Sequence, residues 1–306
     1  MAHSTRRAVL GLGGVAAAAM VMAPRAFAAR ARVLDLPPGL QLWTVKEELA
    51  RDFDRTLGRL KALGYARVEA AGWVDRSPAD FRKGVRGAGL DCFSCHFSML
   101  DLIDEHESKL AAAREVGVRY FVASSPASAK PLDPAKEWVF AVADAMTLDD
   151  WRRNAEAMNR IGARAKALGM RFGYHNHPAE FLTIDGTFVF AELLRLTDPE
   201  LVTFELDLGW VAGAGYDPAK MLAEHGDRIE LLHVKDIAAR ERVPGKIVTD
   251  LNTTPIGAGT LDWAAIFAAA DKARIAAWFV EQEPPFTMSP LVGLERSLGY
   301  LKQLQA

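Results

Sequence analysis

The feature that most constrains the fold of this chain is a regular alternation of eight strand-like and eight helix-like segments after residue 38. Such alternation indicates consecutive βαβ units, and eight of them close into an α/β (β/α)8 TIM barrel. An open doubly wound sheet has less support, because no G-x-G-x-x-G motif follows a predicted strand. The strands are predicted at residues 39–43, 67–70, 92–96, 119–123, 170–175, 202–206, 229–234 and 277–281.

Glycine, proline and small polar residues delimit the predicted helices. Ser77 before Pro78 is typical of a helix start, with serine as the N-cap and proline in the first turn. Thr260 is predicted to cap the helix that contains Asp262. Three helices are predicted to end at a glycine that suits a left-handed C-cap: 48–63, 103–116 and 147–168. Further helices are predicted near 188–196, from 217, from 261 and near 290–303.

Residues 1–28 are interpreted as an export signal rather than as part of the fold. Arg6-Arg7 forms a twin-arginine start, an apolar run follows, and Ala26-Phe27-Ala28 has the small-x-small pattern of a cleavage site. A membrane-anchor helix is the alternative, but the run is short for a span of about 20 apolar residues. We therefore expect a periplasmic protein exported by the twin-arginine route, with a single barrel domain at 29–306 and no membrane contact after cleavage.

Charge and cysteine usage exclude some classes of protein. The formal net charge is −2 and there is no long basic run, so nothing indicates nucleic-acid binding. The two cysteines, Cys92 and Cys95, form a C-x-x-C pair within a predicted strand. Residues three apart in a strand are about 10 Å apart, beyond disulfide reach. We expect two buried or strand-end thiols rather than a redox disulfide.

Potential metal ligands fall at the ends of three predicted strands. Asp207 follows the sixth strand, His233 lies at the end of the seventh and Glu281 ends the eighth. In a closed barrel the carboxyl ends of the strands share one mouth, so these side chains can meet. Carboxylate and imidazole ligands suit Mn²⁺, Co²⁺, Zn²⁺ or Mg²⁺. The pattern predicts a divalent metal site.

Residues 39–304 resemble the xylose-isomerase-like barrel superfamily, which contains sugar isomerases, ketose 3-epimerases and inosose dehydratases. The resemblance rests most on HNHPAEF (175–181), ELDLGW (205–210), LHVKD (232–236) and VEQ (280–282). It implies a metal held by an acid on strand five together with Asp207, His233 and Glu281. Many members have Glu-Asn-His where this chain has His175-Asn176-His177, so the strand-five ligand is open between His175, Glu180 and His177.

The resemblance also implies proton transfer through an enediolate. Glu281 is one expected catalytic carboxylate, and Glu180 would have to be the second if His175 is the strand-five ligand. Lys235 shares a strand face with His233 and is expected to polarise a substrate carbonyl. The alternative for Lys235 is an ion pair with Asp236 or Glu205.

Five further residues are candidates for substrate binding, each with a structural alternative. His96 and Glu69 would point toward the mouth, or make structural hydrogen bonds. Trp210 stands where ketose epimerases often have a sugar-binding histidine, and would stack on a sugar or pack in the core. Arg240 follows strand seven and would bind an acidic substrate group, or be a solvated loop residue. His177 is the fifth candidate.

These observations lead to a ranked set of functions. First is a metal-dependent isomerase or epimerase acting on a non-phosphorylated sugar or keto-sugar, since phosphorylated sugars are largely cytoplasmic. Second is a metal-dependent lyase or dehydratase acting on a 3-keto sugar or inosose-like substrate. Third is a sugar-binding barrel without activity. The expected partner is a small carbohydrate, and a homo-oligomer is compatible with barrels of this group.

Overall fold

The structure is a computed structural model that describes Met1 and residues 32–248 and 251–305. Apart from Met1, the predicted export signal at 1–28 and the predicted first residue of the barrel domain, Ala29, lie outside the described residues. No helix within these described ranges is long and apolar enough to cross a membrane.

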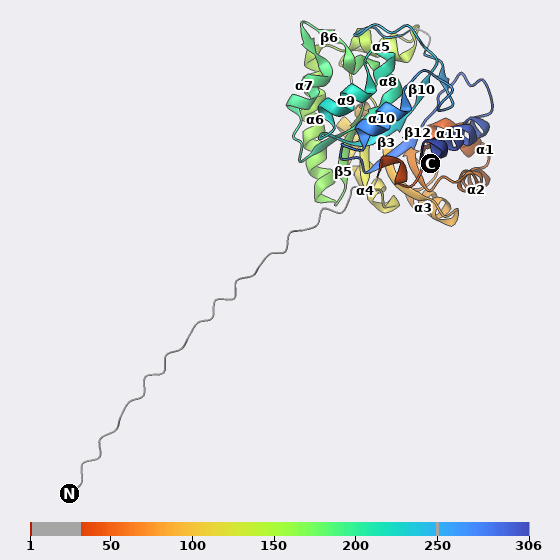
Figure 1. Cartoon of the computed structure of the whole chain (residues 1–306). Helices are drawn as coiled ribbons and strands as arrows, with labels where there is room; N and C mark the ends of the chain where they lie inside the picture. Colours follow the sequence, from red (N-terminus) through yellow and green to blue (C-terminus); the bar gives the residue numbers. More distant parts are fainter. Residues whose placement is uncertain (2–31, 249–250, 306) are drawn as a thin grey trace. The chain divides into compact units, whose positions relative to one another are not determined.

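Eight parallel strands form a closed barrel, which confirms the predicted fold class (Figure 1). Their order around the barrel is β1-β2-β3-β4-β5-β8-β9-β12, and β12 closes it by pairing with β1, Gly39 against Phe279. Because all pairs are parallel, the carboxyl ends lie at one mouth. The strands are β1 Gly39–Gln41, β2 Arg67–Ala71, β3 Asp91–Phe97, β4 Tyr120–Ala123, β5 Arg171–His175, β8 Val202–Asp207, β9 Ile229–Val234 and β12 Ala277–Val280.

Helices surround the barrel and connect its strands (Figure 1). They are α1 Lys46–Arg51, α2 Phe53–Leu63, α3 Pro78–Gly87, α4 Met99–Val116, α5 Trp138–Ala145, α6 Leu148–Ala167, α7 Val189–Leu196, α8 Leu208–Gly213, α9 Pro218–His225, α10 Trp263–Ala270 and α11 Pro290–Gln305. Short 3-10 turns and two-stranded ribbons complete the loops: η1 Val33–Asp35, η2 Leu42–Val45, η3 Pro178–Phe181, β6 Thr183–Ile184 with β7 Thr187–Phe188, and β10 Asp236–Ile237 with β11 Thr253–Thr254.

Local capping explains where the sequence prediction was wrong. The helix predicted at 48–63 is interrupted at Asp52, whose carboxylate accepts a hydrogen bond from the Arg55 amide (3.1 Å) and so begins a new helix. The cap of α10 is Asp262, which accepts from the Ala265 amide (3.0 Å), and not Thr260. The Thr260 hydroxyl instead donates to the Ile237 carbonyl (3.1 Å).

The barrel interior is apolar below its mouth. Phe93 of β3 and Phe279 of β12 lie 6.3 Å apart by ring centroids, although two other strands separate β3 from β12 around the barrel, so they meet across it. Val122, Leu231 and Ala277 complete this buried cluster. Since side chains on one face of a strand recur every second residue, His233 and Glu281, two positions after Leu231 and Phe279, point into the barrel above this floor.

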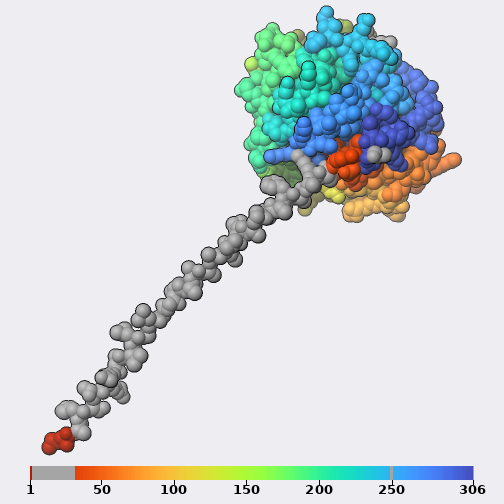
Figure 2. All heavy atoms as spheres, in the orientation of Figure 1, coloured from red at the N-terminus to blue at the C-terminus, as the bar shows by residue number. Residues whose placement is uncertain are grey.

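The start of the described chain is tied to the C-terminal helix at the opposite end of the barrel. The Arg32 guanidinium donates to the Gln305 carbonyl (2.9 Å), and the Trp278 indole donates to the Val33 carbonyl (2.9 Å). In the space-filling view the orange-red segment that follows residue 31 lies against the dark blue α11 (Figure 2). These contacts close the amino-terminal end of the barrel.

Both cysteines are free and buried on strand β3, as predicted. Burial raises the pKa of the Cys92 and Cys95 thiols well above the ordinary range. A thiol of this kind is a small hydrophobic side chain rather than a nucleophile.

Candidate functional site

Buried polar side chains gather inside the barrel just above its apolar floor. They come from six strands of the barrel or directly follow one, so residues as far apart as His96 and Glu205 (109 positions) touch. Seven ionisable residues form this cluster, and the described structure buries nearly all of them: Glu69, His96, His175, Glu205, Asp207, His233 and Glu281. Such charges are retained in an interior only when they are paired or coordinate a metal.

Four of these residues form a set with the geometry of a metal centre. The metal set consists of His175, Asp207, His233 and Glu281, whose ligand atoms all lie within 4.8 Å of one another. His233 Nδ1 lies 2.8 Å from Glu281 Oε2 and 3.7 Å from Asp207 Oδ2, and His175 Nε2 lies 3.9 Å from the same Asp207 oxygen. The set joins the strand-end residues of β5, β8, β9 and β12.

Local structure leaves one oxygen of Asp207 available for an ion. Its Oδ1 accepts a hydrogen bond from the Trp210 amide (2.8 Å) and thereby caps α8. Its Oδ2 is buried and accepts no hydrogen bond from any described residue, although the Lys235 ammonium lies 2.9 Å away. A buried carboxylate oxygen that accepts no hydrogen bond and faces two imidazoles fits a divalent cation. Two nitrogen and two oxygen ligands suit Zn²⁺, Co²⁺ or Mn²⁺ better than Mg²⁺, which prefers oxygen alone.

Glu180, predicted as an alternative strand-five ligand and as a catalytic carboxylate, is not in this set. Its side chain is buried and accepts hydrogen bonds from the Tyr174 hydroxyl (2.5 Å) and the His177 amide (2.9 Å). Tyr174 precedes His175 in β5 and so points to the opposite, helix-facing side of the barrel wall. Burial raises the pKa of Glu180 to about 7. The strand-five member of the metal set is therefore His175.

Exchanging Glu180 for glutamine is expected to destabilise the fold without changing metal binding. A glutamine cannot accept from both the Tyr174 hydroxyl and the His177 amide, because one of its two polar atoms is a donor. We expect a loss of about 1–3 kcal/mol in unfolding free energy. Thermal or denaturant unfolding measures the loss, and metal titration of the same variant supplies the comparison. Weakened metal binding with unchanged stability would contradict this placement of Glu180.

Lys235 is fully buried among carboxylates other than those predicted. Its Nζ lies 2.9 Å from Asp207 Oδ2, 2.9 Å from Glu281 Oε2 and 2.5 Å from Glu283 Oε1. Burial alone would lower the pKa of Lys235, but these three carboxylates raise it well above its usual value. The side chain is a permanent cation beside the metal set.

The predicted alternative partners of Lys235 are both engaged elsewhere. Asp236 accepts hydrogen bonds from the Gly257 amide (2.9 Å) and the Trp263 indole (2.8 Å), and so anchors the loop before α10. Glu205 contacts histidines only, with His96 Nε2 at 2.6 Å and His175 Nδ1 at 3.1 Å. An ion pair of Lys235 with either of these acids is therefore contradicted.

A cavity of about 530 Å³ opens from the metal set toward the mouth. His175 and Glu281 form part of its wall, and so do His96 and His177. The Nδ1 atom of His177 is buried and has no hydrogen-bond partner among the described residues. Apart from the amide of Gln41, the remaining lining residues are aromatic, small or acidic: Trp43, Ala71, Gly72, Phe97, Ser98, Asp101, Ser124, Ser125, Trp138 and Glu283.

The structure separates the five predicted substrate-binding residues. His96 and His177 line the cavity, whereas Glu69 lies beneath it, fully buried. Trp210 packs behind the wall, with its ring 4.3 Å from Lys235 Nζ, so core packing rather than sugar stacking describes it. Arg240 does not line this cavity; it lines a separate hollow beside α9.

Four polar residues in or beside the site were not predicted. Glu205 contacts three histidines and Glu283 pairs with Lys235. Gln41 and Ser94 hold Glu69. The period of two along a strand was the available signal, because Glu205 precedes Asp207 by two residues and Glu283 follows Glu281 by two.

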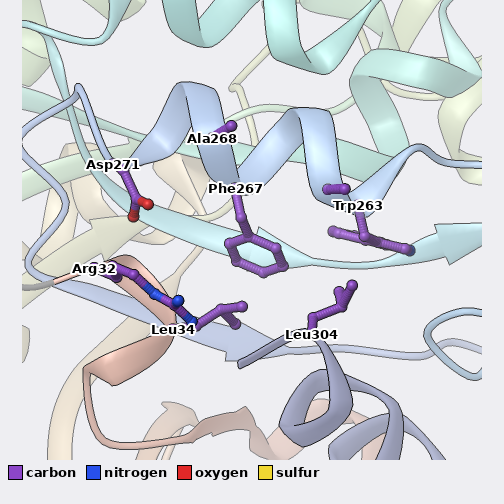
Figure 3. A pocket seen from close by; sticks show the side chains of 8 residues that line it. Arg32, Leu34, Trp263, Phe267, Ala268, Asp271 and Leu304 are labelled. Atoms are coloured by element: carbon purple, nitrogen blue, oxygen red, sulfur yellow. The ribbon is translucent and has the colours of Figure 1, made fainter. Parts of the chain in front are cut away.

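A second hollow, of about 220 Å³, lies between α10, the segment around η1 and the end of α11. Figure 3 shows Phe267 and Trp263 of α10 facing Leu34 and Leu304. None of the residues of the metal set reaches it.

This chain is similar in sequence and in structure to known barrel proteins. Residues 57–304 match the family model described as xylose isomerase-like TIM barrel. An inosose dehydratase from Geobacillus kaustophilus strain HTA426 is 23% identical over 78% of this chain and 84% of the relative. A crystal structure of a sugar phosphate isomerase/epimerase from Parabacteroides distasonis ATCC 8503 is 25% identical, with a TM-score of 0.67 over 90% of this chain and 94% of that one. The IOLI protein with a binding zinc atom shares the fold at 14% identity, with a TM-score of 0.63 over 88% and 98% of the two chains.

Proposed function

Because the chain belongs to the xylose isomerase-like TIM barrel family, we propose that it is a metal-dependent sugar-modifying enzyme, and specifically a lyase acting on an uncharged keto-sugar or keto-cyclitol. The relatives described as inosose dehydratases support the lyase class. The observation that carries the choice is the position of Glu180, which leaves the metal set with one glutamate, Glu281, in place of two.

The metal set would hold the ion through His175, Asp207, His233 and Glu281. When bound, a divalent ion supplies Lewis-acid stabilisation of a substrate oxygen that gains negative charge as a neighbouring proton leaves. The zinc in the IOLI protein structure supports this assignment, since that protein shares the barrel fold. The donor set favours Zn²⁺, Co²⁺ or Mn²⁺.

His177 is the side chain best placed to accept the proton. It lines the cavity, and its buried Nδ1 lacks a partner among the residues that the structure describes. In the proposed elimination, the C–H bond next to the substrate carbonyl breaks and its proton goes to His177. The electron pair forms a C=C bond and the β C–O bond breaks. The leaving oxygen takes the proton back from protonated His177, so that water or an alcohol is released. Lys235 does not line the cavity; its buried ammonium offsets the negative charge of Asp207, Glu281 and Glu283 behind the cavity wall.

The lining of the cavity supports an uncharged substrate. Within the described ranges, no lysine or arginine lines the cavity, whereas Asp101, Glu281 and Glu283 do. Phosphate recognition relies on lysine, arginine or a helix amino terminus, and a phosphate here would meet like charge. Trp43, Phe97 and Trp138 offer apolar faces for a sugar ring. A non-phosphorylated sugar fits this lining better than a sugar phosphate.

An isomerase or epimerase is the second candidate. The 25% identical structure described as a sugar phosphate isomerase/epimerase favours it. The two functions share the first step, removal of a proton next to a carbonyl. They differ afterwards, because an epimerase or isomerase returns the proton and a lyase releases a β-substituent.

Product analysis distinguishes the two functions. The purified protein is loaded with Zn²⁺, Co²⁺ or Mn²⁺ and incubated with an inosose or a 3-keto-glucoside in D₂O. We expect a product lighter than the substrate by water or by the glycosidic alcohol, with the ultraviolet absorption of a conjugated ketone. A product of unchanged skeleton that carries solvent deuterium would contradict the lyase and support the isomerase.

We further propose that the protein is exported to the periplasm as a single barrel domain. Arg6-Arg7 and Ala26-Phe27-Ala28 support this proposal. Fractionation of cells that express the full chain should recover a periplasmic protein beginning at Ala29. Replacing Arg6 and Arg7 with lysine should retain it in the cytoplasm, and periplasmic recovery of that variant would contradict the twin-arginine route.

A further inference from the structure

Three buried residues of the cluster lie directly beneath the metal set and are linked to each other. This inner triad consists of Glu69, His96 and Glu205. His96 Nε2 lies 2.6 Å from Glu205 Oε2 and 3.0 Å from Glu69 Oε2, so one imidazole nitrogen joins the two carboxylates. Glu69 is also held by the Gln41 amide group (2.8 Å) and by the Ser94 hydroxyl. The triad is therefore fixed to β1, β2, β3 and β8.

Each carboxylate of the triad also contacts an imidazole of the metal set. Glu69 Oε2 lies 2.6 Å from His233 Nε2. Glu205 Oε2 lies 3.1 Å from His175 Nδ1 and 3.3 Å from His233 Nε2. The other nitrogens of these rings, His233 Nδ1 and His175 Nε2, face Asp207 and Glu281. Each imidazole thus presents one nitrogen to the metal set and the other to the triad.

The geometry points to the inner triad as a positioning network that determines which nitrogen of each histidine binds the metal. A ligating histidine commonly donates its second N–H to a carboxylate, which fixes its tautomer and orientation and strengthens it as a ligand. Glu205 would receive Nδ1–H of His175, leaving Nε2 for the ion. Glu69 would receive Nε2–H of His233, leaving Nδ1. The inference rests on the proposed function only in requiring that an ion binds the metal set.

The same contacts give His96 a role that links the two ligands. Its ring stacks on His233, with centroids 5.2 Å apart and planes 7° from parallel, and its Nε2 contacts both triad carboxylates. A change at His96 would therefore shift both ligand imidazoles together. Since His96 also lines the cavity, substrate that contacts it would lie directly above this network.

A different use of the triad is possible in principle, because His96, His175, Glu205 and His233 also have ligand atoms within 4.8 Å of one another. Glu205 Oε1 is buried with no hydrogen-bond partner among the described residues. The contacts of the triad with His175 and His233, however, are 2.6–3.3 Å, which are hydrogen-bond lengths. The metal set also contains one contact of hydrogen-bond length, 2.8 Å between His233 Nδ1 and Glu281 Oε2, but its separations of 3.7 and 3.9 Å around Asp207 leave more room for an ion.

Metal titration of single variants tests the network without any substrate. The probe is Co²⁺, measured by competition with a chelator and by its visible absorption spectrum. Glu69→Gln and Glu205→Gln should each weaken Co²⁺ binding about 10- to 100-fold and alter the spectrum, with one ion per chain retained. Glu180→Gln is the matched control, because it makes the same exchange at a buried glutamate on the other side of the barrel wall.

A measurement on the unaltered protein covers the case in which a variant does not fold. In the Zn²⁺-loaded chain labelled with ¹⁵N-histidine, His175 should be metal-bound at Nε2 and protonated at Nδ1, and His233 should show the reverse. The opposite tautomer at either ring, or wild-type affinity and spectrum in both variants, overturns the network. The network is also overturned if the wild-type chain binds two ions and Glu205→Gln loses one of them, because the triad would then be a ligand site.

The outcomes separate this inference from the proposed function. Absence of lyase activity in a protein that binds one ion with the expected tautomers refutes the reaction alone. Failure of the unaltered protein to bind any of the three ions refutes both.

Discussion

Glu281→Gln is expected to lower kcat by about 10³-fold or more. Glu281 Oε2 lies 2.8 Å from His233 Nδ1 and 2.9 Å from Lys235 Nζ. It is therefore placed both to bind the ion and to pair with the lysine. The neutral amide removes a charge from each contact and a ligand from the metal set. Steady-state kinetics with excess metal measures the loss.

A matched exchange separates this effect from general damage. Glu192 on α7 is also buried, but it is held by Arg195 (2.7 and 2.9 Å) and does not line the cavity. Glu192→Gln should therefore retain wild-type kcat. Glu281→Gln with activity within about threefold of the wild type would refute the role given to Glu281 as ligand.

His177→Gln is expected to lower kcat by about 10²- to 10⁴-fold while leaving metal affinity unchanged. His177 lines the cavity but belongs to neither group of potential metal ligands. The exchange should therefore slow proton transfer and leave metal binding intact. The exchange keeps a polar side chain of similar length. Parallel measurement of kcat and of the Co²⁺ dissociation constant tests both parts of the expectation.

His225→Gln is the control for this substitution. His225 lies at the end of α9, is half-buried and does not line the cavity, so its exchange should change neither quantity. If His177→Gln keeps wild-type kcat, another group accepts the proton. If instead it loses the metal, His177 is a ligand and the assignment of His175 fails.

The fold could be predicted from the sequence because long elements carry strong signals. Buried strands at 229–234 and 277–281 and helices ending at Gly64 and Gly117 are recognisable from hydrophobic runs and left-handed caps. Short elements carry little signal of this kind. Helix α8 has six residues, and it begins because the carboxylate of Asp207 accepts the Trp210 amide, a contact that no periodicity reveals.

The metal set was predictable only in part. Asp207, His233 and Glu281 follow from their positions at strand ends, since parallel strands bring these ends together. The choice between His175 and Glu180 depended on the path of η3 after β5, which turns the Glu180 carboxylate toward Tyr174. Part of that path is local, because the Glu180 carboxylate accepts the His177 amide three residues earlier. The sequence does not reveal the contact with the Tyr174 hydroxyl, so it left both residues open.

The residues of the site that were not predicted from the sequence are carboxylates that contact its histidines and its lysine. Glu205 and Glu69 contact histidines, and Glu283 contacts Lys235. A carboxylate inside a strand has no distinctive spacing of its own. Only the pairing of β8 with β5 and β9, together with barrel closure, reveals that Glu205 faces three histidines.

Elemental analysis of the purified barrel, paired with an Asp207→Ala/His233→Ala variant, tests the central claim most directly. The metal set predicts about one Zn, Co or Mn ion per chain in the unaltered protein after reconstitution, and none in a variant that is still folded by circular dichroism. No ion in the unaltered protein, or equal metal content in the two proteins, would contradict the account of this site as a metal centre.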